Sequence, residues 1–534
     1  MSAKAIACPE PLAAETGERT FSAGGTALEG AVAAAFVQGV TNPLGCGLGG
    51  MAHILLARSG WPAPRFLNAS VAAGSYADPA VFEEGFTGRS ERAGRFLLDG
   101  DRNHLGYSSI MTPGFLRGME AVLKLGEGGL NWSALVEPAA AIAAEGFAIY
   151  PYLETYYTFE GPDRPGYPDV FRKLSTDPFA RALYLPGGRP KRAGQMLRQP
   201  EYGRTMQQIG NEGPDEFYLG MLGREMAADF AEHGALVTGG DLAEYRVQGA
   251  DPLHATFHGL TVYSSPPPGH GAILLTMLNI AERIDLAAME WNGTDYLETI
   301  AWATRSAFGD CIPYLADPSF VTVPSQWLIS KERLSAMGEE ASRNGLTAAE
   351  PADGHTTHLA AGSTEGDAIS ITHSIGSVAG AGVMTPSLGF LYNNFMGHFN
   401  PLRGYHNSIA PGKRMGGGSP ALVYKERQPW IAIGSSGGSR LISAVFQTLL
   451  DVIVFKMSLQ EAVAAPRIHS ESGRKIYLEP AFPSAVIDSL QHRGYDVEVT
   501  DYMGCNQAVE FTSEDVRPAS DPRGGRGVGH WPRL

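Results

Sequence analysis

The segment with the clearest capacity for chemistry is a hydroxyl-rich stretch, TTHLAAGSTEGDAISITHS, which runs from Thr356 to Ser374. Two short apolar runs flank a polar turn that contains glycine, and this pattern predicts a β-hairpin. If Ala361 pairs with Ala368, Thr356 lies opposite His373 and adjacent to Ser374. Strand alternation then gathers the hydroxyls of the second strand on one face, beside Thr356. Such a face fits a nucleophilic site, but these residues alone favour a half-exposed strand whose polar side faces water.

A second segment, WIAIGSSGGSRLISAVFQ, carries a turn rich in glycine and serine from a strand to the start of a helix. The free N–H groups at a helix start, with the positive end of the helix dipole, can hold an anion or an oxyanion. Gly437 and Gly438 have no Cβ atoms, so a substrate carbonyl can come close to the backbone. A tight turn without a ligand favours the same residue types.

The elements that must position these segments are mostly helices first and strands later. Apolar spacing and end signals predict helices over residues 24–43, 113–125, 132–145 and 214–233, and another from residue 272. A polar linker over 326–353 leads into Thr356. Strands are predicted in MAHILLARSG, in the hairpin, in FLYNN and in PALVYKERQPWIAIGSS, which turns at Lys425–Gln428. A long helix and a strand–helix–strand set follow, so the order predicts packed sheets with helical outer layers.

Composition and motifs argue against several function classes. The 534 residues include 56 acidic and 41 basic ones, a net charge of −15, without a dense Lys/Arg stripe, so no nucleic-acid partner is expected. No window reaches the roughly 20 apolar residues of a membrane span. The N-terminus lacks the apolar core of a secretory signal. These two observations predict no membrane partner and a cytoplasmic location.

Metal sites and disulfides are not expected either. The four cysteines are widely spread and form no CxxC pair, which argues against a disulfide framework and a structural zinc site. His398 and His406 have no third ligand at a useful spacing. The sequence therefore predicts neither a metal nor another cofactor.

The two hydroxyl- and glycine-rich segments occur in a longer series of motifs. Through this series the sequence resembles the γ-glutamyltranspeptidase family of N-terminal-nucleophile (Ntn) hydrolases. The matching stretches include GGTALEGAVAAAFVQGVTNPLGCGLGGMAHIL, TPGFLRGMEAVLK, EPAAAIAAEGFAI, GPDEFYLG, GALVTGGDLAEYRV, YSSPPPGHGAILLTMLNI, TTHLAA, GFLYNNFM, KRMGGGSPALV, GSSGGSRLI and ASDPRGG. They keep the family's order and cover roughly Gly24 to Gly525. The TTH triplet followed by GSxGGS is a specific combination.

The resemblance implies a precursor that cuts itself before the first threonine of TTH. Thr356 is then expected to attack the carbonyl carbon of His355 and to become a new N-terminus. Its free α-amine, with a reference pKa of about 7.7–8.0, can take the hydroxyl proton. Ser374 matches the family's hydroxyl that hydrogen-bonds the nucleophile. Gly437 and Gly438 match its oxyanion hole.

The resemblance also implies the architecture. An α/β fold of the α+β kind is expected, a four-layer αββα sandwich with two stacked, mainly antiparallel sheets between helical layers. Residues 1–355 would form a large subunit and residues 356–534 a small one, together making one domain. The expected partners are these two subunits and a small-molecule substrate, and a higher oligomer is left open.

The family's clamp for the γ-glutamyl group is replaced in this sequence. Without it, the α-ammonium and α-carboxylate of that group would be desolvated and unpaired, at a cost on the order of several kcal/mol. The replaced positions are predicted to bind another acyl group. They are Leu67 for the arginine that grips the carboxylate, Gly376 for the asparagine two residues after the auxiliary hydroxyl, Phe395 and His398 for the pair that holds the amine, and Gly416 and Gly417 for two serines.

Four functions remain open on this sequence. The first is an amidohydrolase or acylase that removes a different acyl group. The second is a biosynthetic relative that cleaves a carbon–carbon bond next to a carbonyl with the same threonine. The third is γ-glutamyl transfer or glutathione hydrolysis with a rearranged clamp, and the fourth is a non-catalytic binding protein. A carboxylate anchor from a new direction could come from Arg65, Arg403 or Arg414.

Overall fold

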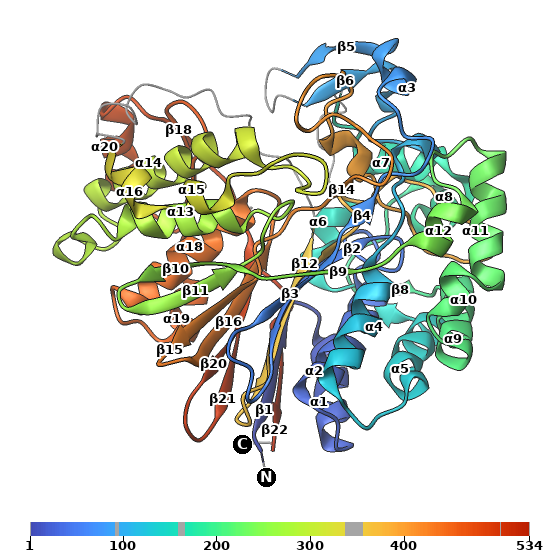
Figure 1. The fold of residues 1–534 in the computed structure, drawn as a ribbon, viewed down its shortest axis with the longest axis horizontal. Helices are drawn as coiled ribbons and strands as arrows, with labels where there is room; N and C mark the ends of the chain where they lie inside the picture. Colours follow the sequence, from blue (N-terminus) through green and yellow to red (C-terminus); the bar gives the residue numbers. More distant parts are fainter. Residues whose placement is uncertain (1, 91–94, 159–165, 337–355, 502, 533–534) are drawn as a thin grey trace.

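The computed structural model describes residues 2–90, 95–158, 166–336, 356–501 and 503–532. Figure 1 shows two β-sheets face to face near the centre, with helices over the outer side of each sheet. The two chain ends lie together because β1 (Lys4–Cys8) pairs with β22 (Gly527–Trp531). The layers follow the order helix, sheet, sheet, helix, as predicted for an αββα sandwich.

The first sheet has seven strands, and each strand is antiparallel to its neighbours. The predicted hairpin lies in the middle of this sheet, so other strands cover both of its edges. The spatial order is β22, β1, β12 (Thr357–Ser363), β13 (Ala368–Ser374), β2 (Met51–Ala57), β3 (Arg65–Ala69) and β9 (Gln248–Ala250).

The second sheet has six antiparallel strands and carries the glycine-rich turn at the end of β16. The predicted turn at Lys425–Gln428 is confirmed, with Glu426 and Arg427 at positive φ between β15 and β16. The spatial order is β10 (Leu253–Phe257), β11 (Leu260–Ser264), β15 (Ala421–Lys425), β16 (Gln428–Ser436), β20 (Cys505–Phe511) and β21 (Val516–Ser520).

Helices cover the outer face of each sheet. On the first sheet lie α1 (Pro11–Ser22), α2 (Ala27–Thr41) and α4 (Phe115–Gly126), with α5 (Trp132–Glu145) and α9 (Pro200–Glu212) packed outside α2. On the second sheet lie α13 (Gly271–Ala281), α18 (Arg440–Ile453) and α19 (Leu459–Ala464), with α14 (Thr294–Cys311) against α13. Smaller elements include α6 (Pro151–Tyr157), α7 (Val170–Thr176), α8 (Pro178–Tyr184), α20 (Ser484–His492), β17 (Ile468–His469), β18 (Lys475–Leu478) and β19 (Asp496–Val499).

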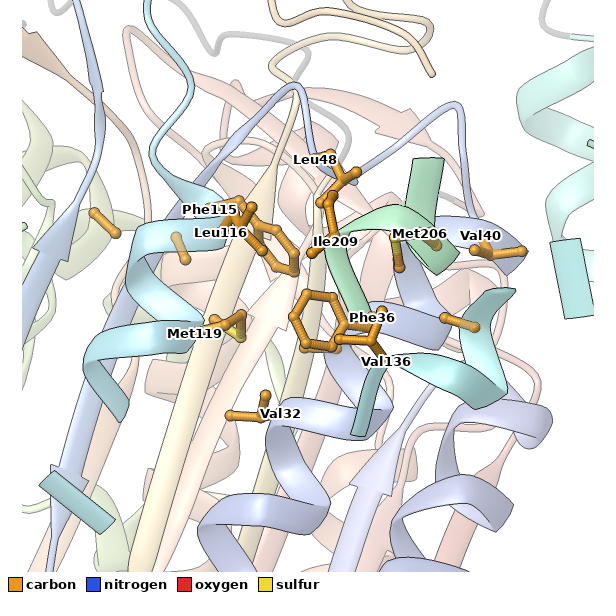
Figure 2. Close-up of a cluster of buried hydrophobic side chains, with 14 of the residues drawn as sticks. Val32, Phe36, Val40, Leu48, Phe115, Leu116, Met119, Val136, Met206 and Ile209 are labelled. Atoms are coloured by element: carbon orange, nitrogen blue, oxygen red, sulfur yellow. The ribbon is translucent and has the colours of Figure 1, made fainter. Parts of the chain in front are cut away.

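Helix α2 is the central support of the hairpin, and its limits follow from its sequence. A capping box starts it, in which the Thr26 hydroxyl accepts from Glu29 N and the Glu29 carboxylate accepts from Thr26 N. The alanine-rich body is buried along its whole length, because small side chains allow strands and helices to approach on all sides. Figure 2 shows Phe36 of this helix beside Phe115 of α4, with their ring centroids 5.9 Å apart.

Two predicted elements differ from the structure. The helix predicted over 214–233 is two helices, α10 (Asp215–Tyr218) and α11 (Met221–Glu232). The helix is interrupted at Gly220, because the Glu216 carboxylate accepts from Met221 N at 2.7 Å and so caps the start of α11. The strand predicted in FLYNN is only a single bridge between Tyr392 and Gly49.

Within the described ranges, no helix is both long and apolar enough to cross a bilayer. The cytoplasmic location expected from the sequence stays a prediction.

Candidate active site

The hairpin has a different register from the predicted one. Thr357, not Thr356, pairs with His373, and the shift of one residue places Thr356 level with Ser374. The predicted register was wrong because the first strand continues to Ser363 and the turn starts one residue later. In the observed register the two hydroxyls lie together, and Thr356 Oγ1 donates to Ser374 Oγ at 3.3 Å.

The hydroxyl face of the hairpin is buried, so the alternative of a half-exposed strand is wrong. Every residue of β12 and β13 is buried, and only 7% of Thr356 is exposed. The second sheet covers this face. Ser370 Oγ donates to the Ile433 carbonyl of β16 at 2.9 Å, and the His358 ring occupies the space where a Cβ on Gly434 would lie, 2.2 Å away.

These two contacts place the glycine turn at the same end of the sandwich as Thr356. His358 lies one pleat closer to Thr356 than Ser370 does. Along β16, the residue contacted by His358, Gly434, follows the residue contacted by Ser370, Ile433, so both strands run toward the same end. One pleat further on, β16 ends and leads into Gly437 and Gly438, just before α18. Both glycines have positive φ, 122° and 62°, which favours glycine at these positions. The turn can therefore present backbone N–H groups toward Thr356.

Gly376 cannot be replaced by the asparagine of the γ-glutamyl clamp without rearrangement. Its φ is +101°, and a Cβ on it would lie 2.2 Å from Asn394 Oδ1. The Asn394 side chain is held in place because Nδ2 donates to the Ser377 hydroxyl at 2.7 Å and to the His104 carbonyl at 2.9 Å. Sequence reasoning assigned no role to Asn394, although the NN pair of GFLYNNFM, which is one of the matching stretches, was the available signal.

The loop with Gly416 and Gly417 lies over histidines that sequence reasoning missed. A Cβ on Gly416 would lie 2.6 Å from Met51 Cε and 3.1 Å from His53 Nε2. A Cβ on Gly417 would lie 3.1 Å from the His270 ring. The two serines of the clamp are thus replaced by backbone that packs closely over imidazoles.

Phe395 makes the site wall apolar on the side of β2. It packs in a buried cluster with Met51, which faces Ser374 across the strands, and with Met415. The half-buried His398 ring lies 5.3 Å from the Phe395 ring. An apolar wall of this kind suits the carbon chain of an acyl group better than an ammonium ion.

Leu67 is not brought to Thr356. It points to the outer face of the first sheet and packs in the core beneath the helices, whereas Thr356 lies on the inner face. The inner-face neighbour in β3 is Asn68, level with His53. His355 lies outside the described residues.

None of the three candidate arginines is poised as a substrate anchor. Arg65 stacks on Trp61, 4.3 Å away, and Arg403 is exposed and pairs with Asp78. Arg414 is buried, but its guanidinium donates to Asn68 O at 3.2 Å and to the Tyr245 hydroxyl at 3.0 Å.

Burial keeps the imidazoles of this region neutral at ordinary pH. It lowers the pKa of each ring because the charged form loses its hydration, and neighbouring positive groups add to the effect at several of them. The pKa falls to about 3 for His53, His358 and His398 and to about 4 for His270. Because these four imidazoles are uncharged, none of them can act as a positive partner for the carboxylate of a substrate. These imidazoles are therefore weak bases near neutral pH.

Removing the Ser374 hydroxyl is expected to slow the enzyme without abolishing it. Ser374→Ala loses the acceptor for Thr356 Oγ1 and for Gly376 N, which it bonds at 2.9 Å. We expect kcat to fall about 10–10²-fold, as for the loss of one or two hydrogen bonds in the transition state. Steady-state kinetics on matured enzyme check this, with Ser363→Ala, at the far end of the hairpin, as the control. An unchanged kcat would contradict the contact's role.

The sandwich of two antiparallel sheets between helices, with a threonine hydroxyl at the start of a central strand, defines the class of Ntn hydrolases. The Gamma-glutamyltranspeptidase family profile matches residues 13–531. The chain belongs to the γ-glutamyltranspeptidase family, whose members are hydrolases and acyltransferases.

Individual relatives include both acylases and glutathione hydrolases. The Acylase ACY 1 proenzyme of Pseudomonas sp. (strain SE83) is 35% identical over 503 residues, which cover 91% of this chain and 86% of the relative. The Glutathione hydrolase proenzyme of Pseudomonas aeruginosa is 30% identical over 98% of this chain and 94% of its own. The crystal structure of cephalosporin acylase from Bacillus halodurans has a TM-score of 0.85 and 25% identity, covering 100% of this chain and 97% of that one.

Proposed function

We propose that this protein is a self-cleaving acylase, an amidohydrolase whose acyl group is not γ-glutamyl. The observation that carries the proposal is the buried pair of hydroxyls on Thr356 and Ser374, at the same end of the sandwich as the glycine turn that follows β16. Acylases among the relatives support the same class of reaction.

Maturation follows from the position of Thr356. Its hydroxyl oxygen attacks the carbonyl carbon of His355, the peptide C–N bond breaks, and the nitrogen takes up the proton that the hydroxyl loses and becomes a free amine. Water then hydrolyses the resulting ester, which leaves a carboxylate on His355 and a free hydroxyl on Thr356. Cleavage divides the chain into residues 1–355 and 356–534, which stay together because both segments contribute strands to each of the two sheets.

In catalysis the α-amine of Thr356 takes the hydroxyl proton as the oxygen attacks the substrate carbonyl. Gly437 and Gly438 donate backbone N–H groups to the oxyanion, a contribution whose loss typically costs a factor of about 10²–10³. Ser374 orients the nucleophile. Phe395, His398, Gly416, Gly417 and Gly376 surround the acyl group, while Leu67 acts at most through the sheet that supports them.

A γ-glutamyl substrate is expected to be poor. Its α-ammonium and α-carboxylate would lie against the apolar wall that Phe395 and Met51 form. We expect kcat/KM for a γ-glutamyl anilide to be at least about 10²–10³-fold lower than for an anilide with an uncharged acyl chain of equal length. Steady-state assays of the two compounds decide this, and comparable values would overturn the proposed specificity.

The acyl group itself can be identified by trapping. Matured enzyme is mixed with a panel of amides, β-lactam side chains and oxo-acids, quenched with acid and analysed by mass spectrometry of the peptide that begins at Thr356. An acyl adduct on Thr356 from an amide supports the acylase. An adduct only from a compound with a carbon–carbon bond next to a carbonyl would favour the biosynthetic alternative.

A further inference from the structure

A buried glutamate lies behind the catalytic threonine, on the side of β12 that faces the helices. Glu10 joins β1 to α1 and is 0% exposed. Thr357, the residue next to Thr356, donates its hydroxyl to Glu10 Oε1 at 3.0 Å. Gln38 Nε2 of α2 donates to Oε2 at 2.5 Å, and Asn42 Nδ2 donates to Oε1 at 3.0 Å. All three donors are neutral, so they favour the ionised carboxylate without cancelling its charge.

The same network holds the second strand of the hairpin. Gln38 Oε1 bonds His373 Nε2 at 2.9 Å, and Gln38 Nε2 also reaches the Thr357 hydroxyl at 3.0 Å. Thr357 and His373 are paired across the strands, one step inward from Thr356 and Ser374. The glutamate is thus connected to both strands next to the nucleophile.

Within the parts of the chain that the structure describes, no lysine, arginine or histidine pairs with this carboxylate. Burial raises its pKa above the usual value for a glutamate, and the bonds from Gln38, Asn42, Thr357 and Tyr152 offset only part of this rise. The other titratable groups nearby are neutral, because burial raises the pKa of the thiols and phenols and lowers that of the imidazoles. They are Cys8, Cys46, Tyr150, Tyr152, Cys505, His358 and His373; Arg467 and Asp521 beyond Cys505 pair with each other.

A buried carboxylate without a counter-charge is costly in a folded protein. Cleavage before Thr356 supplies one. The uncharged amide nitrogen of Thr356 becomes an α-amine that can be protonated, on the residue adjacent to Thr357 and its bond to Glu10. We propose that Glu10 is the counter-ion of this new N-terminus and sets the proton affinity of the catalytic base. The inference rests on the proposed cleavage and concerns a residue to which that proposal gives no part.

The expected consequence follows from the sign of the charge. Burial alone lowers the pKa of an amine, and a carboxylate close to it raises the pKa, because it stabilises the ammonium form. Glu10 therefore keeps the amine of a nearly buried Thr356 a strong base near neutral pH, where a general base works best. Loss of the negative charge should lower this pKa.

The test is the pH profile of kcat/KM for matured Glu10→Gln, which keeps the shape and the acceptor oxygen but removes the charge. The acid limb should move to lower pH by about one unit, a tenfold change in the fraction of free amine at a given pH. Glu29→Gln is the matched control, since Glu29 is a buried glutamate that caps α2 and bonds Leu130 N, and its profile should not move. A purely structural role for Glu10 would lower the rate at every pH without moving the limb.

A second measurement uses the unaltered enzyme and covers the case of a variant that does not fold. The pKa of the Thr356 amine is read from the pH dependence of its carbamylation by cyanate, followed on the N-terminal peptide of the small fragment. A value at or above the reference of about 7.7–8.0 supports the counter-ion, and a value below about 7 overturns it. A folded Glu10→Gln chain that stays uncut would assign Glu10 to the cleavage step and overturn its role in the mature amine. An unaltered chain that stays uncut would instead remove the proposed function.

Discussion

Thr356→Ala is expected to remain a single chain of 56.9 kDa, whereas the unaltered protein separates into fragments of about 38 and 19 kDa, in proportion to their 355 and 179 residues. Alanine lacks the oxygen that attacks the His355 carbonyl, so neither the ester nor the new N-terminus can form. Hydrolysis should fall by at least about 10⁴-fold, because nucleophile and base are lost together. Denaturing gels, and N-terminal sequencing that starts at TTH in the unaltered protein, check the cut.

Two controls separate chemistry from folding in this experiment. Thr356→Ser keeps the hydroxyl and should mature and hydrolyse substrate, although more slowly. Thr364→Ala removes a hydroxyl from the turn of the same hairpin, where it bonds Ala3 N at 3.0 Å, and should mature normally. A Thr356→Ala chain that is still cut at the same bond would remove Thr356 as the nucleophile.

Gly376→Asn, which restores the residue of the γ-glutamyl clamp, is expected to destabilise the protein without creating a γ-glutamyl site. The asparagine must adopt a backbone φ of +101°, and its Cβ would lie 2.2 Å from Asn394 Oδ1. Left-handed strain and the forced displacement of Asn394 together should cost about 2–4 kcal/mol. Denaturant unfolding measures the loss, and a γ-glutamyl anilide assay measures the function.

The matched control for this substitution is Gly404→Asn. Gly404 also has a positive φ, +85°, but a Cβ there meets no atom within 4 Å. The control therefore carries the backbone strain alone, and the difference between the two variants measures the collision with Asn394. Adding Asn394→Ala to Gly376→Asn should recover part of the stability. Equal stability of the two single variants would show that the space at Gly376 is not closed.

The effect of Glu10 on the acid limb of the kcat/KM profile depends on the cleavage that Thr356→Ala tests, but the two can be measured separately. The amine exists only after the cut, so maturation must be established first. Once fragments appear, the pH profile of Glu10→Gln bears on the counter-ion alone. The Ser374→Ala kinetics then report on the other partner of Thr356, its hydroxyl.

Local pattern determined much of this protein. Alanine spacing and the Thr26–Glu29 box specify α2, the polar turn at Lys425–Gln428 specifies the β15–β16 hairpin, and the motif series around TTH identifies the family. These features depend on residues close together in the chain, where capping, turn and propensity rules apply directly.

Tertiary structure decided the register of the hairpin, the burial of its hydroxyl face and the neighbours of each site residue. A shift of one residue exchanges the two faces of a strand, and only the second sheet and α2 select the register that brings Thr356 to Ser374. The same reason places Leu67 on the far side of the sheet, Asn394 in the space beside Gly376 and Glu10 behind Thr357, because these contacts join residues up to hundreds of positions apart. Sequence alone determined the kind of chemistry; the packing of distant segments decided which side chains surround it.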